Sequence, residues 1–398
     1  MRLHSTAAGR AVPFAPADGR TVTMYVCGPT VYAEPHLGHA RSALVYDTLR
    51  RRFRQKGWRV KHAMNFTDMA EEIAHRASLE GRTIRDTARK YATLYLRDTA
   101  GLRVLRPTHL TWASKFVPRM VEDIQALLDQ GLAYEQDGSV YFDTVKGHPL
   151  GMVSRVAFHD VTAGEAPRTG RKDPGDFVLW RNSHDWGECW IAPWSCGRPG
   201  WHNQCSAMAL RTLGPTLDLH GGGVDLAFPH HDSEAAVAQA LTGKPLARHW
   251  LHNGHVTVWK EKMSKSRGNF VLAREATRRH GPDAVRLFLL SARYRDTLDY
   301  DPKAMRSWAS LARTHHKALQ AAARHAGRAR PSVDWDPWRA EFAAALDDDL
   351  DTPRAMGLLR EAAPRIARSP GKGADAAAAA RALREASWAL GLDARIQP

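Results

Sequence analysis

The stretch "MYVCGPTVYAEPHLGHARSALVYDTLRRRF", residues 24–53, decides the fold of this chain. Residues 21–26 are rich in β-branched and aromatic side chains, which predicts a buried strand that ends at Cys27. Apolar residues then recur at helical spacing from Leu37 to Phe53, which predicts a helix directly after the turn. A purely structural turn does not need a cysteine at the end of the strand or two histidines at the start of the helix. The stretch therefore suggests a site as well as a fold.

The same order of elements repeats immediately afterwards. The segment "WRVKHAMNFT" (58–67) predicts a second strand, and "DMAEEIAHRASLEG" (68–81) predicts a second helix. Alternating strands and helices open an α/β fold with a Rossmann-like, doubly wound parallel sheet. Ligands bind such sheets beyond the carboxyl ends of the strands, where Cys27 and Thr67 fall.

The remaining sequence divides by composition. We predict an amphipathic helix at 116–135, a strand at 138–145, a turn- and tryptophan-rich insertion to about residue 200, a further strand at 249–258 and helices after Tyr300. The expected domains are an α/β catalytic domain (1–115 and 200–258), a connective insertion (116–199), a loop-containing region (259–305) and an α-helical bundle (306–398).

Composition narrows the class of protein. The chain has 398 residues, and its 57 Lys and Arg against 42 Asp and Glu give a net charge of +15. This excess predicts a polyanionic partner, of which nucleic acid is favoured over a membrane surface or a phosphate ligand. Biased base composition of the genome is the alternative explanation. No apolar run reaches the roughly 18 residues of a membrane span, and the N-terminus has no hydrophobic segment. We expect a cytoplasmic protein.

The four cysteines, Cys27, Cys189, Cys196 and Cys205, are few for a chain of this length. Their number argues against a disulfide framework and favours a metal-binding or catalytic use.

One possible metal site includes residues from three parts of the chain. His230 and Glu234 are four residues apart on a predicted helix, so both side chains face one way, whereas His231 and Asp232 should point elsewhere. Cys27 and Cys205 could complete a tetrahedral site suited to zinc. Cys189 and Cys196 could instead join Cys205 in a three-cysteine group. Spacing alone leaves both arrangements open.

Two further segments suit polyphosphate. His36 and His39 begin a helix whose free N–H groups and dipole favour anions, and Gly38 allows a ring to approach the backbone closely. The segment "KEKMSKSRGNF" (260–270) resembles a cationic loop that closes over a substrate, and no Walker A motif occurs. Taken singly, surface histidines and a solvated charged loop are the ordinary alternatives.

Together these motifs resemble a known family. "HLGH" (36–39) and "KMSKS" (262–266) resemble the signature pair of class I aminoacyl-tRNA synthetases. "YVCGPTVY", "NFTD", "GRPGWHNQCSAM", "LHGGGVDLAFPHHDSE", "HNGHV" and "DAVRLFLLSARYR" resemble the cysteinyl branch, and the similarity runs in unbroken order from about residue 20 to about residue 360.

The resemblance implies one Zn²⁺ per chain, held by Cys27, Cys205, His230 and Glu234, and gives Cys189 and Cys196 no role. It implies a cysteine pocket formed by Cys27, Gly28, Thr67, Trp201, His220 and Asp225. The residues expected around ATP and Mg²⁺ are Thr30, His36, Gly38, His39, Gly221, Gly222, Gly223, Lys262, Ser264, Lys265 and Ser266, of which His36, His39, Lys262 and Lys265 are expected to be catalytic. Region 259–305 would then carry the KMSKS loop and contact the tRNA stem.

The implied activity is formation of cysteinyl-adenylate from L-cysteine and ATP, followed by transfer to tRNA by a monomeric enzyme. "CGPTVY", "LHGGG" and the seven Lys and Arg residues within 301–330 favour tRNA as acceptor. The chain ends at "LGLDARIQP", before the expected anticodon-reading unit. This shortness also fits a related ligase of the mycothiol pathway, which joins cysteine to the amine of an aminosugar-inositol; another small amine or carrier acceptor is also open. A tRNA-binding relative without catalysis is the third hypothesis.

Overall fold

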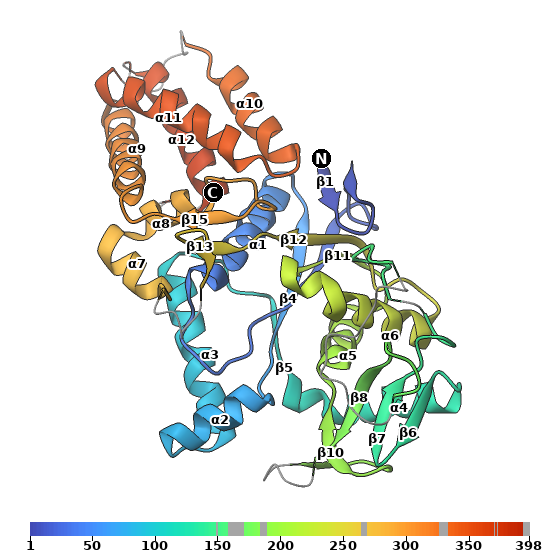
Figure 1. Cartoon of the computed structure of the whole chain (residues 1–398). Helices are drawn as coiled ribbons and strands as arrows, with labels where there is room; N and C mark the ends of the chain where they lie inside the picture. Colours follow the sequence, from blue (N-terminus) through green and yellow to red (C-terminus); the bar gives the residue numbers. More distant parts are fainter. Residues whose placement is uncertain are drawn as a thin grey trace.

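The computed structural model describes residues 1–148, 150–157, 171–183, 189–263, 269–325, 333–369, 371 and 373–392. A five-stranded parallel sheet lies at its centre (Figure 1). The strands follow the spatial order β12-β11-β3-β4-β5, with bounds Ala247–Asn253, Leu217–Gly223, Thr21–Val26, Arg59–Phe66 and His109–Trp112.

This order confirms the expected doubly wound sheet. The chain runs outward from β3 to β4 and β5, and then returns to add β11 and β12 on the other side of β3. The direction of winding therefore reverses between β3 and β11, where the register pairs Val26 with Gly221. Crevices form at such a switch point because the helices on its two sides diverge to opposite faces of the sheet.

Helices pack against the sheet and fix its strands. They are α1 (Leu37–Gln55), α2 (Glu71–Glu80), α3 (Ile84–Gly101), α5 (Trp201–Leu213) and α6 (Asp232–Thr242), and a hairpin of β1 (Arg2–Ser5) and β2 (Arg10–Pro13) lies beside β12. The buried Tyr46 of α1 donates its hydroxyl to the carbonyl oxygens of Gly222 (3.0 Å) and Leu251 (2.6 Å). This side chain links α1 to both strands beyond the switch point.

The segment between β5 and α5 forms a second sheet. It contains η1 (Ala113–Phe116), α4 (Val117–Asp129) and an antiparallel sheet in the order β6-β7-β8-β10-β9, with bounds Ala133–Gln136, Ser139–Phe142, Phe177–Asn182, Cys196–Pro199 and Trp190–Ile191. The predicted helix at 116–135 is too long, because residues 133–136 form a hairpin with β7. Asp137 and Gly138 both have positive φ, as an Asp-Gly turn of this kind requires.

The predicted strand at 249–258 is in fact two strands in different sheets. β12 ends at Asn253, and β13 (Val256–Val258) joins β14 (Glu261–Lys262) and β15 (Leu298–Tyr300). Gly254 makes the crossing possible, because a Cβ there would lie 2.4 Å from the carbonyl oxygen of Asp296. Hydrophobic alternation continues through this break and hides it.

The sequence argued against a disulfide framework and for a metal-binding or catalytic use of the cysteines, but one pair is bonded. Cys189 and Cys196 are bonded, with their Cα atoms 5.6 Å apart. The pairing of Gly197 with Trp190 in the β9–β10 hairpin brings the two cysteines together. Cys27 and Cys205 remain free.

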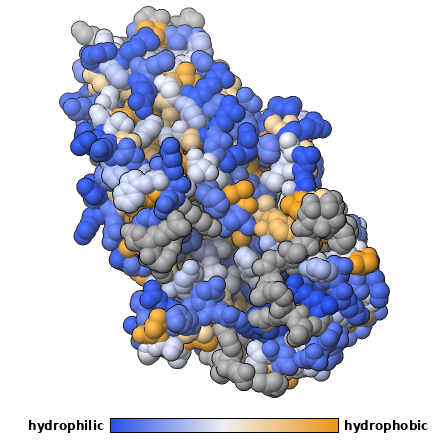
Figure 2. Space-filling view, viewed as in Figure 1, coloured by the Kyte–Doolittle hydropathy of each residue, from blue (hydrophilic) through white to orange (hydrophobic). Residues whose placement is uncertain are grey.

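The C-terminal part is helical, as predicted. It comprises α7 (Ala273–His280), α8 (Pro282–Leu289), α9 (Met305–His325), α10 (Asp336–Asp347), α11 (Thr352–Arg368) and α12 (Ala374–Leu390). The bundle of α9–α12 stands at one end of the molecule (Figure 1) and presents a largely hydrophilic surface in the view of Figure 2. No described helix is long and apolar enough to cross a bilayer.

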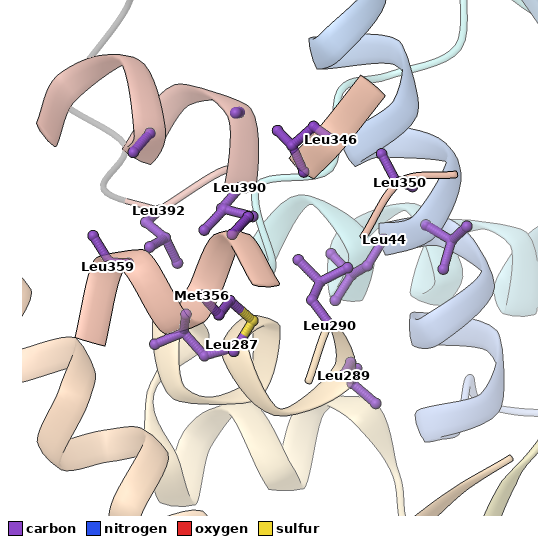
Figure 3. Close-up of a cluster of buried hydrophobic side chains, with 14 of the residues drawn as sticks. Leu44, Leu287, Leu289, Leu290, Leu346, Leu350, Met356, Leu359, Leu390 and Leu392 are labelled. Carbon is purple, nitrogen blue, oxygen red and sulfur yellow. The ribbon is translucent and has the colours of Figure 1, made fainter. Parts of the chain in front are cut away.

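The bundle shares its core with the α/β part. Leu44 of α1 lies in one buried cluster with Leu287, Leu290, Met356 and Leu390 (Figure 3). The assignment of domain boundaries in the sequence stays a prediction.

Candidate functional site

A cavity of about 340 Å³ opens at the switch point of the parallel sheet. Residues at the carboxyl ends of four strands line it, among them Cys27, Thr67, Gly223 and Asn253, together with His36 at the start of α1. This is where sheets of this topology bind ligands.

The four predicted metal ligands converge at one side of this cavity. The candidate ligand atoms of Cys27, Cys205, His230 and Glu234 all lie within 4.8 Å of one another. Glu234 Oε1 is 2.7 Å from His230 Nε2 and 3.4 Å from Cys27 Sγ. Two thiols, an imidazole and a carboxylate at these distances fit a single four-coordinate metal ion.

Neighbouring rings orient His230 within this cluster. Its Nδ1 is 3.1 Å from Nδ1 of His202, and the ring of Trp201 stacks on it with centroids 4.2 Å apart. Nε2 is therefore the nitrogen that faces Glu234 and Cys27. A ligand histidine whose second nitrogen is held by another group is the usual arrangement in metal sites.

His231 also faces the cluster, contrary to the sequence prediction. Its Nε2 is 3.3 Å from Cys27 Sγ, and Cys27, His220, His231 and Glu234 form a second group within 4.8 Å. The prediction considered only the i, i+4 pair, but residues three apart also share a face of a helix, and His231 stands three residues before Glu234. The chain is also kinked before α6, with extended φ and ψ at Phe228, and both consecutive histidines face inward.

Asp232 does point away, as predicted. Its carboxylate accepts hydrogen bonds from the backbone N–H of Val153 (2.6 Å) and the hydroxyl of Ser154 (2.5 Å).

The surroundings of the cluster favour the ionised forms of the Cys205 and Glu234 side chains. A hydrogen bond from Cys27 lowers the pKa of the Cys205 thiol to about 6, although burial opposes this, while burial raises the pKa of Cys27. Burial also acts to raise the pKa of Glu234, but the charges of His230 and His220 outweigh it and hold that pKa well below its ordinary value. Burial acts to lower the pKa of His230, but the charge of Glu234 outweighs it and raises that pKa to about 10, so a thiolate and a carboxylate lie beside one imidazolium.

The two histidines of the "HLGH" motif cap α1. His36 Nδ1 accepts the N–H of Gly38 (3.0 Å), and His39 Nδ1 accepts the N–H of His36 (3.4 Å). Both rings line the cavity, with centroids 4.0 Å apart. Burial lowers the pKa of His39 to about 4, with Asp225 opposing, so this ring is neutral at pH 7.

The ring that lies close over the backbone of Gly38 is that of His36. A Cβ on Gly38 would lie 2.7 Å from Cε1 of His36. The glycine is thus needed for the cap itself.

Most other predicted residues border the same cavity. Gly28, Thr30, Gly38, Thr67, Trp201, Gly223 and Asp225 line it. His220 lies behind Cys27, with Nε2 3.5 Å from Sγ. Ser264, Lys265 and Ser266 lie outside the described residues, as does the side chain of Lys262, so their roles stay predictions.

Gly221 and Gly222 do not line the cavity. A Cβ on Gly221 would lie 2.4 Å from the hydroxyl of Tyr46, and one on Gly222 would lie 2.8 Å from Cδ1 of Leu226. These two glycines admit side chains of the protein itself, and only Gly223 faces the cavity.

Sequence reasoning did not single out several residues that line the cavity. Asn65 accepts the N–H of Gly28 through Oδ1 (2.9 Å) and so fixes the turn after Cys27. Tyr95 enters from the middle of α3, and His255 from the link between β12 and β13. Asn65 lies in the quoted "NFTD" motif and His255 in the quoted "HNGHV" motif, whereas no motif marks Tyr95.

The chain resembles proteins of known class along most of its length. A family model described as "tRNA synthetases class I (C) catalytic domain" matches residues 13–310. A cysteine--tRNA ligase of Desulforudis audaxviator is 41% identical over 371 residues, covering 90% of this chain and 78% of the relative. A cysteine--tRNA ligase of Delftia acidovorans is 40% identical over 390 residues, covering 96% and 83%.

Solved structures agree on the fold. A Mycobacterium tuberculosis methionyl-tRNA synthetase in complex with methionyl-adenylate superposes with a TM-score of 0.63 at 20% identity, over 94% of this chain and 82% of that one. With the sequence matches, this similarity leads to one conclusion: the chain belongs to the cysteinyl-tRNA synthetase family of class I aminoacyl-tRNA synthetases.

Proposed function

We propose that this protein is an ATP-dependent, AMP-forming ligase that activates L-cysteine and transfers it to the 3′ end of tRNA. The observation that carries the proposal is the convergence of Cys27, Cys205, His230 and Glu234 beside the capping histidines of α1, in a chain of this family. The cavity thus has one side suited to a soft metal and another suited to a phosphate chain.

Selection of cysteine is the task we assign to the cluster. Thiol and hydroxyl differ little in size, so a shaped pocket alone would reject serine poorly. A bound zinc ion supplies a preference for soft sulfur ligands. We assign its coordination to Cys27, Cys205, His230 and Glu234, and contacts with the rest of the amino acid to Gly28, Thr67, Trp201, His220 and Asp225.

Activation needs positioning more than proton transfer. A carboxylate oxygen of cysteine bonds to the α-phosphorus of ATP, the bond to the bridging oxygen of the β-phosphate breaks, and pyrophosphate leaves with its Mg²⁺. The neutral ring of His39 and the ring of His36 can hydrogen-bond to phosphate oxygens as charge develops, and Thr30 and Gly223 border the same space. We assign Lys262 and Lys265 the closure over the leaving pyrophosphate.

Transfer then completes the reaction. A ribose hydroxyl at the 3′ end attacks the carbonyl carbon of cysteinyl-adenylate, an ester bond forms, the bond to the phosphate oxygen breaks, and AMP and a proton leave. The relatives named above are tRNA ligases at about 40% identity, and this chain carries a net charge of +15; both support tRNA as the acceptor.

The test is cysteine-dependent exchange of pyrophosphate into ATP. We expect exchange with cysteine, none with serine, and one zinc per chain by elemental analysis. Cys205→Ser or His230→Ala should remove metal and exchange together, because each removes one of four ligands. Cys196→Ser, which changes a cysteine outside the cluster, is the matched control and should retain the metal.

Retention of stoichiometric zinc and full exchange in Cys205→Ser would refute the ligand assignment. Exchange without charging of any tRNA, but with conversion of an aminosugar-inositol, would replace the proposed acceptor by that of the mycothiol-type ligase. A protein that binds tRNA but shows no exchange would support the non-catalytic hypothesis.

A further inference from the structure

A second cavity, of about 170 Å³, adjoins the candidate active site. It lies between α1 and α3, and residues of β3 and β4 form its floor. Cys27, Ser42 and Tyr95 border both cavities. The function proposed above makes no use of this second space.

The walls of the second cavity are mainly apolar. Most of the lining residues have apolar side chains, among them Val26, Met64, Leu96 and Val104. The charged side chain among them, that of Arg106, is exposed and therefore lies at the rim. A charged ligand would lose its hydration inside without gaining a buried counterion, so the cavity favours an uncharged one.

One buried polar side chain faces this space without a partner. His62 lines the cavity and is 6% exposed, and neither of its ring nitrogens has a hydrogen-bond partner in the described part of the chain. Residues two apart on a strand point to the same side of the sheet, and Met64 accepts a hydrogen bond from the hydroxyl of Tyr95 on α3. The imidazole of His62 therefore points toward α3 and into the cavity.

The buried hydroxyl groups of the walls are already engaged. Tyr46 donates to carbonyl oxygens of β11 and β12, and Tyr95 donates to the sulfur of Met64. Thr99 donates to the carbonyl oxygen of Tyr95 (2.8 Å). Among the buried side chains that line the cavity, His62 is thus the one left to bind a polar group.

His62 can both donate and accept a hydrogen bond. Burial lowers the pKa of His62 to about 3, and the charge of Arg50 acts in the same direction, so the ring is neutral at pH 7. A neutral imidazole offers one N–H donor and one acceptor nitrogen. Leaving both unmet in a buried place costs free energy, which a hydroxyl or N–H of a ligand would recover.

Water is a poor occupant of this cavity. A buried water makes about three hydrogen bonds, and the buried side chains here offer it a single imidazole. The volume is close to that of an apolar cavity of roughly 150 Å³ that binds benzene. Size and polarity together therefore fit one small ring with one polar group.

We propose that the second cavity is a binding site for a small uncharged aromatic molecule with one hydroxyl or N–H, which is hydrogen-bonded to His62 while the ring packs against Met64 and Leu96. This site is independent of the function proposed above, because its occupant needs neither ATP nor tRNA. Phenol has the required size and polar group and is the probe. Toluene has the same ring without the hydroxyl and is the comparison ligand.

The experiment measures the dissociation constants of phenol and toluene for the full chain at pH 7, by ligand-observed NMR. His62→Phe removes the hydrogen-bonding group. Ala43→Leu fills the cavity from α1, and Ala100→Leu fills it from an exposed position near the end of α3. The matched control is Ala74→Leu on α2, which lines neither cavity.

We expect the parent to bind one phenol per chain, with saturation. Ala43→Leu and Ala100→Leu should weaken the binding of both probes about tenfold or more, because the added side chain occupies the space. The control should bind as the parent does. In His62→Phe, phenol should lose about tenfold in affinity relative to toluene, in line with the loss of one hydrogen bond. This ratio corrects for any change of cavity volume, which affects the two probes alike.

Three results would overturn the proposal. The parent might bind neither probe with saturation, which would mean that the cavity holds water alone. Both filled variants could bind phenol as the parent does, which would place phenol elsewhere. An unchanged ratio of the two dissociation constants in His62→Phe would show that His62 does not anchor the ligand.

Discussion

His62 shows at the scale of one residue how burial without a partner affects stability. It lies within β4, and neither ring nitrogen has a hydrogen-bond partner in the described part of the chain. Burial lowers the pKa of His62 to about 3, with the charge of Arg50 acting in the same direction and Asp47 opposing. In the unfolded chain an imidazole takes up its proton near pH 6.5. The unfolded state therefore binds more protons between these values, and the folded state loses stability as the pH falls below 6.5.

His62→Phe should remove this part of the acid sensitivity. We expect the free energy of unfolding of the variant to fall by about 1 kcal/mol less than that of the parent between about pH 7.5 and about pH 5.5, as thermal or urea unfolding would measure. His75→Phe, at an exposed position, is the control and should follow the parent. Equal pH dependence in His62→Phe and the parent would contradict the prediction.

Gly221 and Gly357 make opposite predictions at the scale of strand and helix. In β11, a Cβ on Gly221 would lie 2.4 Å from the hydroxyl and 2.5 Å from Cε1 of the buried Tyr46. Gly221→Ala should therefore force β11 and α1 apart and cost about 1–3 kcal/mol of unfolding free energy. In α11, a Cβ on Gly357 meets nothing within 4 Å, so Gly357→Ala should stabilise by up to about 1 kcal/mol.

Thermal unfolding of both variants checks this pair. A melting temperature for Gly221→Ala at or above that of the parent would show that Tyr46 can move, and that the close contact does not constrain the strand.

The elements also show what sequence could and could not predict. Periodicity found β3, α1 and β4 because each runs from a clear start signal to a clear end, and the doubly wound order followed from their succession. It failed at 249–258, where the alternation of apolar residues continues although the chain changes sheets at Gly254. The alternation of apolar and polar residues along a segment does not indicate which other strand the segment will pair with.

The sequence predicted those residues of the candidate site that lie in recognisable motifs. The similarity to a family predicted Cys27, Cys205, His230 and Glu234 as one ligand set, and these side chains lie close together in the structure. His231 was missed because the argument used only the i, i+4 spacing, whereas the i, i+3 spacing from His231 to Glu234 also places two side chains on one face of a helix. The second cavity could not be anticipated, because its walls come from α1, α3 and β4 and no motif spans them.

At the scale of the whole molecule, one buried ionic group joins the helical bundle to the α/β part. Asp47 of α1 is fully buried and accepts hydrogen bonds from Arg286 (2.6 Å) and Arg51 (2.9 Å). Arg286 also donates to the carbonyl oxygens of Leu102 (2.6 Å) and Leu390 (2.7 Å). Helices α1, α8 and α12 and the end of α3 thus meet at one guanidinium.

Asp47→Asn should destabilise the molecule by about 3–5 kcal/mol, because it leaves the buried charges of Arg286 and Arg51 without their counterion. We expect a lower melting temperature and earlier proteolytic cleavage of the bundle. Glu122→Gln removes an exposed partner of Arg119 and should change neither. Unchanged melting of Asp47→Asn would mean that the hydrogen bonds of Arg286 to carbonyl oxygens suffice to join the two parts.

The wide separation of the four cluster residues along the chain has a consequence for biogenesis. Cys27 precedes Cys205 by 178 positions (205 minus 27), and the inserted sheet is synthesised between them. A nascent chain therefore carries Cys27 without the other three residues of the cluster until the inserted sheet has been made, and His230 and Glu234 follow only after β11. An ion that binds the four side chains stabilises only the folded state. When cells grow with little metal, we therefore expect a lower yield of folded protein.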